Sequence, residues 1–521
     1  MSEFGVAYGG SVWSSGPGFM TYLVTTILIT SLLAWYIKRR RMVALVNLLP
    51  GPNGYPIIGN ALDMNKDSQG IFKQLIKYTE LGDVIRIWIG PVPMIILSSA
   101  KAVEALFSSR VNIDKSREYD ALHPWLGTGL LNSTGSKWQS RRKMLTPAFH
   151  FKILDNFIDV FDSQACKLVE KLRGKADGHL FNIYPHFTLC ALDIICETAM
   201  GRTVNAQDNE NSEYVRAVTR LGEMIVERAF KAWLHNDIVY WLSGLSKEHD
   251  THINVLHKFT RDTIKERRAL YHQLKETTHI PTEEEKLLGK KKLLAFLDLL
   301  LEASDGESAL TDDDIREEVD TFMFEGHDTT TVAMNWALYF LARHPDIQAR
   351  VHNELDSILG DRERPVTSSD LREMKYLEMC IKESLRLLPS VPTIGRVIRE
   401  ELTVGDNLRV PVGGDIIIML YKIHRDPEHF PDPEKFDPDR FLPENASKRH
   451  PFAYVPFSAG ARNCIGQRFA LMELKTVLAR VLQQYRVESD TSFCDLQLTA
   501  QLVLRPVDGN YIRMYPRSGV E

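Results

Sequence analysis

The 521-residue chain has few cysteines and no strong excess of charge of either sign. Its six cysteines include no Cys-x-x-Cys pair, which argues against a disulfide framework or a structural zinc site and favours a reducing compartment. A formal net charge of −5 gives no reason to expect a nucleic-acid partner. We find no internal repeat and only one long uncharged apolar run, so the chain is not a multi-span transporter. Its 44% hydrophobic and 25% charged content is ordinary for a globular protein.

The one long apolar run covers residues 19–37 and contains no charged side chain. A helix of this length extends about 28 Å, close to the roughly 30 Å hydrocarbon core of a membrane. A cleaved signal peptide or a buried core helix is the alternative, but residues 1–18 lack the Lys or Arg that a signal peptide needs. Four basic residues follow at 38–41, so the positive-inside rule predicts a cytosolic body.

A segment rich in proline and glycine follows the basic residues, at 49–56 (LPGPNGYP). Proline fixes φ and disfavours helix before it, so this segment should end the anchor and form a stiff hinge. We therefore expect four parts. They are a short lumenal N-terminus (1–18), a transmembrane anchor (19–37), a basic stop with a Pro/Gly hinge (38–56) and one enzyme-sized body (57–521).

Most of the body has helical periodicity, and strands are few. Residues 84–97 predict two strands about a Gly-Pro turn, and residues 408–420 predict a second hairpin. Residues 314–343 form the longest helical stretch, and apolar side chains surround much of it, as expected of a helix inside the core. The charged segment 282–292 predicts a solvated loop. The predicted fold is mainly α with a small β subdomain, preceded by a single transmembrane helix.

The sharpest local signal is the loop FSAGARNCIG at residues 457–466, which precedes a helical run at 467–484. A lone cysteine is usually a small buried hydrophobe. Cys464 instead lies just before a helix, where backbone N–H groups and the helix dipole favour a thiolate. The missing Cβ atoms of Gly460 and Gly466 would let a flat cofactor approach the backbone. A catalytic cysteine nucleophile is the alternative, and its activating histidine would have to come from elsewhere in the fold.

This loop resembles the haem-binding signature FxxGxRxCxG of the cytochrome P450 family, the haem-thiolate monooxygenases. Further motifs in the family's order extend the likeness over residues 50–515. The resemblance implies the P450 fold and a heme b cofactor whose iron takes Cys464 as its axial thiolate ligand, which favours O–O cleavage. Phe457, Gly460 and Gly466 belong to the same signature and are expected at the cofactor.

Glu383 and Arg386 match the ExxR pattern of the family, in which both side chains share one face of a helix. The pattern alone has almost no weight. It gains weight from residues 436–441 (FDPDRF), which resemble the segment whose arginine, here Arg440, completes a Glu-Arg-Arg cluster. A carboxylate shared by two guanidinium groups can lock an irregular loop to a helix. The three residues are therefore expected to hold the haem loop in place.

Four residues are expected at the two haem propionates. Trp138 and Arg142 match the family's WxxxR pattern, in which both contact a propionate. A surface basic helix is the alternative, because residues 141–143 are all charged. With the cysteine loop present, we favour the propionate contact and expect Arg396 and Arg462 to join it, since buried carboxylates need such partners.

The segment FEGHDTT at residues 324–330 lies within the longest predicted helix and resembles the family's oxygen-activation motif, [AG]GxDT. Thr and Asp are poor formers of helix interiors, so we expect the helix to open locally here. The resemblance implies that Asp328 and Thr329 relay protons toward bound O2. Polar residues that simply face solvent are the alternative, which the apolar neighbours of the motif weaken.

Glu325 stands where the family usually has Ala or Gly. A carboxylate in an apolar cavity is costly unless it is neutralised or paired. The longer string at residues 318–330 resembles family four, the fatty-acid ω-hydroxylase branch, many of whose members esterify this glutamate to a haem methyl group. The resemblance predicts that Glu325 can form such an ester. A tethered haem would narrow and stiffen the pocket, which favours attack at a chain terminus.

Two sets of apolar residues fall where the family admits its substrate. The first set should line the pocket and the second should form a membrane-facing lid, although apolar stripes at helical spacing are usually plain core. The first set is Tyr119, Leu122, Trp125 and Leu126, and the second is Phe230, Trp233, Leu234, Tyr240, Trp241 and Leu242.

The resemblance implies a monooxygenase anchored in the endoplasmic reticulum that takes electrons from NADPH through NADPH–cytochrome P450 reductase, with cytochrome b5 as a further candidate partner. Arg141, Lys143 and Arg468 are candidates for a basic docking surface. Expected substrates are fatty acids hydroxylated at or near the ω end, or other lipophilic molecules such as terpenoid hormones and xenobiotics including insecticides.

Two other functions stay open. A haem-thiolate isomerase or dehydratase would consume a peroxide without a reductase, and retention of Asp328 and Thr329 argues against it. A non-catalytic haem-based sensor or lipid carrier would also leave this pair without a role.

Overall fold

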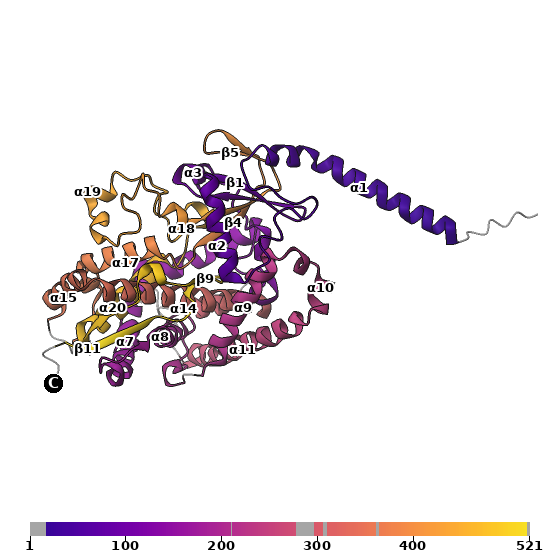
Figure 1. The fold of residues 1–521 in the computed structure, drawn as a ribbon. Coiled ribbons are helices and arrows are strands. Elements are labelled where there is room, and N and C mark those ends of the chain that lie inside the picture. The colour runs from indigo at the N-terminus through magenta and orange to yellow at the C-terminus, as the bar shows by residue number, and fades with distance from the viewer. Residues whose placement is uncertain (1–16, 210, 278–295, 306–309, 361–363, 518–521) are drawn as a thin grey trace, which may run out of the picture.

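The computed structural model describes residues 17–209, 211–277, 296–305, 310–360 and 364–517, and the predicted loop at 282–292 lies outside them. Helices dominate the described chain (Figure 1). The α-helices are α1 (Pro17–Asn47), α2 (Ser68–Tyr78), α3 (Ala100–Ser108), α4 (His123–Leu126), α5 (Gly135–Leu145), α6 (Phe151–Leu154), α7 (Ile158–Leu172), α8 (Tyr184–Thr198), α9 (Glu213–Phe230), α10 (Asp237–Leu242), α11 (Leu245–Thr277), α13 (Phe296–Ser304), α14 (Asp312–Arg343), α15 (Pro345–Leu359), α16 (Ser368–Glu373), α17 (Lys375–Leu387), α18 (Leu420–Ile423), α19 (Pro443–Ala446) and α20 (Gln467–Gln484).

The strands are short and form small sheets beside the helices. They are β1 (Val84–Ile89), β2 (Val92–Leu97), β3 (Phe181–Asn182), β4 (Thr393–Val397), β5 (Leu402–Val404), β6 (Leu408–Val410), β7 (Asp415–Met419), β8 (Tyr485–Glu488), β9 (Leu498–Ala500), β10 (Leu504–Pro506) and β11 (Tyr511–Pro516). The largest sheet has the order β1-β2-β7-β4, and the next has the order β3-β11-β8. The mainly α fold with a small β part is therefore confirmed.

The two predicted hairpins have different outcomes. Strands β1 and β2 pair antiparallel about the Gly-Pro turn, as predicted. The prediction of a hairpin at 408–420 is wrong, because β6 pairs with β5, whereas β7 enters the large sheet between β2 and β4. The residues of β7 are buried throughout, and a strand buried on both faces belongs in the middle of a sheet. Gly413, at φ +82°, lies in the turn that separates the two strands.

Helix α1 projects away from the rest of the molecule (Figure 1). Its segment Phe19–Ile37 is long and apolar enough to cross a membrane and is not buried by the protein, so it is a candidate anchor. The helix continues through the basic residues to Asn47 and ends just before the Pro/Gly segment at 49–56. Its last turns rest on the body, where Arg39 donates to the carbonyl oxygen of Pro91 and Arg41 pairs with Glu401 at 3.1 Å.

Helix α14 runs through the core and packs against α8, α17, α20 and α11. At 32 residues it is one residue shorter than α11, so it is not the longest helix. Almost all of its residues after Asp314 are buried, as expected of a core helix. A Cβ atom at Gly326 would lie 2.5 Å from Ile195 Cδ1, so this glycine lets α14 and α8 approach closely. The predicted helix at 467–484 is confirmed as α20.

Candidate active site

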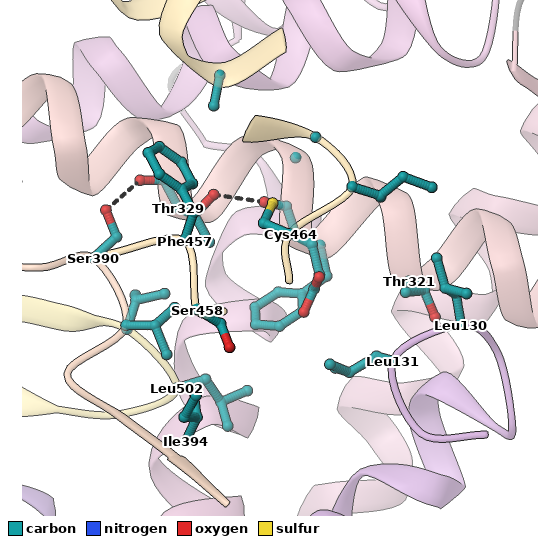
Figure 2. Close-up of a pocket in the computed structure, with 18 of the residues that line it drawn as sticks. Leu130, Leu131, Thr321, Thr329, Ser390, Ile394, Phe457, Ser458, Cys464 and Leu502 are labelled. Atoms are coloured by element: carbon teal, nitrogen blue, oxygen red, sulfur yellow. Dashed lines mark hydrogen bonds between the residues drawn. The ribbon is translucent and has the colours of Figure 1, made fainter. Parts of the chain in front are cut away.

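An internal cavity of about 330 Å³ lies between α14 and the loop that precedes α20. Figure 2 shows Thr329 of α14 and Cys464 of that loop among the residues that line it. Apolar side chains from several elements make up much of the remaining wall. They include Leu122, Phe149, Ile195, Phe230, Phe322, Ala333, Ile394, Leu502 and Val503.

Cys464 lines this cavity (Figure 2). Its N–H donates to the carbonyl oxygen of Phe457 at 2.9 Å, which closes the loop around it. Burial, together with the charge of Glu325, raises the pKa of the thiol to about 11, although a hydrogen bond from the Gly466 N–H lowers it in part. Burial thus opposes the thiolate that the helix start favours, and binding of a metal ion would displace the thiol proton.

The two glycines of the loop have different roles. Gly466 lines the cavity, and a Cβ atom added to it would make ordinary van der Waals contacts, at 3.8 Å from Phe149 Cε1 and 3.9 Å from the Cys464 sulfur. Gly460 does not line the cavity. It adopts φ +71°, and a Cβ atom there would lie 2.2 Å from the carbonyl oxygen of Phe107. In the structure this glycine lets the loop pack against α3, and its expected place at the cofactor stays a prediction.

Three of the four residues predicted at the propionates line the cavity. Arg142 donates to the carbonyl oxygen and Oδ1 of Asn463 at 2.8 and 2.7 Å, which places its guanidinium beside the cysteine loop. Arg462 lies over the Trp138 ring at 4.5 Å and donates to nearby backbone carbonyls. Arg396 is buried but does not itself line the cavity, and it donates to the carbonyl oxygen of Gly395 at 2.8 Å.

Lys115 is a cavity residue that the sequence analysis missed. Its Nζ lies 4.4 Å from the Tyr119 ring centroid. Burial and the charges of Arg396 and Arg462 hold its pKa well below the usual value, which the Glu325 carboxylate partly offsets. Its sequence surroundings are full of other charged residues, so no local signal marks it. A dianionic group in the cavity would relieve the repulsion among these cations.

Glu325 faces the same cavity as Cys464. Burial raises the pKa of its carboxyl, and the positive charge of Lys115 opposes that shift. No side chain in the described part of the chain forms an ion pair with this carboxylate, which lies at a place where a flat cofactor held by the Cys464 sulfur would meet it. This arrangement fits a group with an iron centre and two carboxylates, held at one side by the sulfur and at the edge by cations.

The predicted opening of the helix at 324–330 is wrong, because α14 is continuous there. Three consecutive hydroxyl groups, of Thr329, Thr330 and Thr331, donate to the carbonyl oxygens of the residues four positions earlier. These bonds follow the helical ladder rather than replace it. Ser390 donates to the carbonyl oxygen of Thr329 at 2.8 Å and ties α14 to the segment before β4 (Figure 2).

Asp328 does not line the cavity that holds Thr329. It is 1% exposed, and it accepts a short hydrogen bond from Arg505 of β10. Arg505 also donates to the hydroxyl of Tyr184 at 2.9 Å. Adjacent residues of an α-helix point about 100° apart, so the two members of the predicted pair face different sides of α14.

The structure brings the predicted Glu-Arg-Arg cluster together. Glu383 accepts two hydrogen bonds from Arg386, at 2.7 and 2.8 Å, and Arg440 Nε lies 3.4 Å from Oε1 of the same carboxylate. Arg386 also donates to the carbonyl oxygen of His424 at 3.0 Å. The His424 Nε2 accepts from the N–H of Val455 at 2.9 Å, two residues before the cysteine loop begins. The cluster is thus connected to the loop through His424.

Glu473 of α20 is a second residue that the motifs did not reveal. It is 1% exposed, and its Oε1 accepts from Thr330 Oγ1 at 2.9 Å. Burial raises the pKa of this carboxyl to about 8. Its other oxygen has no hydrogen-bond partner within the described part of the chain.

The predicted surface and entry residues divide into two groups. Arg141 is buried and pairs with Asp314 at 2.5 Å, so it cannot belong to a docking surface, whereas Lys143 and Arg468 are exposed. Trp125 and Leu126 are wholly buried and do not line the cavity, but the other members of the entry set, Tyr119 and Leu122, do.

The predicted lid is likewise divided. Phe230 lines the cavity, and Leu234 and Tyr240 are buried. The exposed members are Trp233, Trp241 and Leu242, of which Leu242 is 70% exposed.

These features define a haem-thiolate site. A cysteine on a tightly bonded loop faces the cavity, cations line its wall, and the core helix α14 forms another part of that wall. Comparisons with known proteins agree. The family description Cytochrome P450 matches residues 49–513. The chain is 48% identical to cytochrome P450 4c3 of Drosophila melanogaster over 98% of this chain and 96% of that protein. It is 49% identical to cytochrome P450 4V2 of Homo sapiens over 90% of this chain and 89% of that protein.

The likeness to cytochrome P450 4d2 of Drosophila melanogaster is 42%, over 94% of this chain and 97% of that protein. The chain belongs to the cytochrome P450 family, and these relatives are members of family four. It is a haem-dependent monooxygenase with a cysteine thiolate as the axial ligand of the iron. Enzymes of this family take electrons from a redox partner and act on lipophilic substrates.

Proposed function

We propose that this enzyme hydroxylates fatty acids at or near the ω end, with electrons from NADPH delivered by a membrane-bound reductase. The observation that carries the proposal is the position of Glu325 in the same cavity as Cys464. An ester between Glu325 and the cofactor would fix the cofactor against α14 and narrow the space above it. The apolar wall formed by Ile195, Phe230 and Leu502 suits an alkyl chain and offers it no hydrogen bond.

Haem supplies the oxidising chemistry when it is bound. The chain's own residues bind and orient it, with Cys464 as the iron ligand and Arg142, Arg462 and Lys115 as partners of the propionates. Trp138 supports Arg462 from one face, and Arg396 adds positive charge behind it. Thr329 holds a hydroxyl at the cavity wall, and we assign proton transfer to Thr329 and Asp328 together. Glu383, Arg386 and Arg440 keep the cysteine loop in position.

The same proposal assigns the membrane and partner surfaces. The candidate anchor Phe19–Ile37 would hold the enzyme in the endoplasmic reticulum with the body on the cytosolic side. The exposed apolar side chains of Trp241 and Leu242 would rest on the same membrane. Lys143 and Arg468 remain candidates for contact with NADPH–cytochrome P450 reductase, and cytochrome b5 is a second candidate partner.

The test is turnover of saturated fatty acids of increasing chain length by the membrane-bound protein with reductase and NADPH. The position of the hydroxyl group is read by mass spectrometry. We expect terminal hydroxylation in wild type and a shift toward internal positions in Glu325→Ala. Wild-type haem should stay with the chain after acid denaturation, and the variant should release it. Oxidation of terpenoids or xenobiotics without fatty-acid turnover would overturn the substrate assignment, and peroxide-dependent isomerisation without a reductase would overturn the reaction.

A further inference from the structure

Residues 119–131 form one wall of the active-site cavity, and we call them the α4 segment because α4 lies at their centre. The members that line the cavity are Tyr119, Leu122, Leu130 and Leu131, the last two of which are labelled in Figure 2. Trp125 does not line the cavity, but its ring packs on that of Phe324, which does, at a centroid distance of 4.8 Å. The position of α4 therefore sets the shape of this wall.

A buried histidine of α11 holds the end of α4. His257 is 8% exposed, and its Nε2 lies 2.8 Å from the carbonyl oxygen of Trp125. The last carbonyl groups of a helix have no partner inside the helix, so α4 needs a donor from another element. Burial lowers the pKa of His257 below its usual value, so its imidazole is neutral at pH 7 and carries one proton.

Two residues of α14 complete the cluster around this imidazole. Arg316 Nη1 lies 2.9 Å from His257 Nε2 and donates to Asp320 Oδ2 at 2.9 Å. A guanidinium group only donates and a carbonyl only accepts, so Nε2 cannot bond to both at once. Arg316 is already satisfied by Asp320, whereas the Trp125 carbonyl takes its hydrogen bond from His257. The proton therefore belongs on Nε2, where it bonds α11 to α4.

The surrounding elements have bonds of their own. Asp320 is 1% exposed, and its Oδ1 accepts from Thr260 of α11 at 2.5 Å, which joins α14 to α11 directly. Further along the α4 segment, the N–H of Leu130 donates to Glu318 Oε2 of α14 at 2.9 Å. Loss of the bond from His257 would therefore release the Trp125 end of α4 and leave the other contacts in place.

We propose that His257 is a positioning residue that sets the substrate-facing wall of the cavity by holding α4. Without its bond, the Trp125 end of α4 moves away from Phe324, and Leu122 moves with it. The substrate chain is then held less tightly and reaches the reacting centre at more than one of its carbon atoms. His257 itself does not line the cavity, so it acts only through α4.

This inference does not depend on which lipophilic substrate the enzyme takes. Any molecule that the wild type oxidises at a defined carbon serves for the test. A failure of the fatty-acid assignment therefore leaves the role of His257 testable. The effect is also distinct from that of Glu325→Ala, because variants of His257 should retain haem after acid denaturation as the wild type does.

The experiment compares His257→Leu with His257→Gln in the full-length holoenzyme with reductase. Leucine is similar in size and has no donor, whereas a glutamine amide can donate to the carbonyl and accept from Arg316. His257→Leu should weaken substrate binding, read from the spectral shift of the haem, by about two- to ten-fold, as expected for the net loss of one hydrogen bond. It should also spread the hydroxyl group over more carbon positions. His257→Gln should restore both properties.

A second readout needs no turnover. Hydrogen exchange of the backbone amides in residues 119–131, measured by mass spectrometry, should be faster in His257→Leu and close to wild type in His257→Gln. His249→Leu is the matched control, because His249 is 4% exposed on the same helix and packs on Tyr240 of α10. This control should keep the wild-type product positions and the wild-type exchange in the α4 segment.

Unchanged binding, product positions and exchange in His257→Leu would overturn the proposal. Equal losses in His257→Leu and His257→Gln would also overturn it, because the hydrogen bond would then not carry the effect. If His257→Leu does not bind haem, His257→Asn takes its place, since its shorter side chain leaves the Trp125 carbonyl without a donor. That variant should show the same losses, and wild-type behaviour in it would overturn the proposal.

Discussion

The cysteine loop at 457–466 and the oxygen-activation segment at 324–330 are both short motifs, but they position their residues in different ways. In the loop, neighbouring residues serve one local shape. Gly460 takes a positive φ against α3, Arg462 binds surrounding carbonyls, and Cys464 closes back on Phe457. The whole motif thus contributes to one feature, the placement of the sulfur.

In α14 the residues of the motif diverge, because each position turns about 100° from the one before. Thr329 faces the active-site cavity, Asp328 faces Arg505, and Thr330 bonds to Glu473 of α20. Neighbouring residues of a motif on a helix therefore contact several different parts of the protein. Neighbouring residues of a motif in a loop can all support one local shape.

The largest effect is expected at the single ligand of the loop. Cys464→Ser should remove the red-shifted Soret band that thiolate-ligated haem shows after reduction and carbon monoxide binding, because a serine hydroxyl does not supply a thiolate. Cys190→Ser, at a buried cysteine away from the cavity, is the matched control and should keep the band. A band that survives in Cys464→Ser would remove this loop from the site altogether.

The next largest effect is expected for residues that hold the cysteine loop in place. Glu383→Gln leaves Arg386 buried with an uncompensated charge, which costs about 3 to 5 kcal/mol of unfolding free energy. Glu373→Gln breaks an exposed pair with Lys375 and should cost under about 1 kcal/mol. Urea unfolding of both variants measures the difference. Equal stabilities would show that the cluster does not hold the loop.

Two alanine variants separate the roles of the loop glycines. Gly460→Ala meets both a positive φ and the Phe107 carbonyl and should cost about 1 to 3 kcal/mol or more. Gly466 has an ordinary φ, and a Cβ atom there makes only ordinary van der Waals contacts, so the stability of Gly466→Ala should change little while the haem spectrum shifts. Thermal unfolding and absorption spectra of the two variants check this. A destabilised Gly466→Ala with an unchanged spectrum would contradict the assignment.

Features that depend on local patterns could be predicted from the sequence, whereas features that depend on distant partners could not. The apolar run of α1, the strands β1 and β2, the Cys464 loop and the Glu383–Arg386 pair are all coded within a few residues. Lys115 and Arg505 are not, because each meets charges from distant parts of the chain: Lys115 those of Glu325 and Arg396, and Arg505 that of Asp328. Nothing in the few residues around either one shows the cavity that it lines.

The predicted pairing of β7 was wrong for the same reason, since its partners β2 and β4 come from distant parts of the sequence. The predicted exposure of Arg141 was also wrong. Its charge predicts a surface position, but the carboxylates of Asp314 and Glu318 compensate that charge inside the protein. A local pattern reports which groups are present, and tertiary contacts decide which of them face a cavity.

The smallest expected effect is a pH dependence of stability at Glu473, the partner of Thr330 in the α14 motif. Burial holds its pKa at about 8, so between about pH 4.5 and 8 the folded state keeps a proton that the unfolded state has lost. Stability should therefore fall as pH rises through this window, by up to about 1.4 kcal/mol per pH unit from this group.

The Glu473→Gln side chain is neutral at every pH, so this variant should lose the part of the pH dependence of stability that comes from Glu473. Glu318 and Asp320 have carboxyls with pKa values near 7 and add slopes of their own, so the informative quantity is the difference between variant and wild type. That difference should favour the variant increasingly from pH 6 to pH 8 in urea unfolding of the holoenzyme. Glu248→Gln, at a carboxylate whose pKa is lowered by Arg220, should show no such trend. Parallel curves for Glu473→Gln and wild type would mean that Glu473 is ionised in the fold and that the Thr330 side of α14 faces a charge.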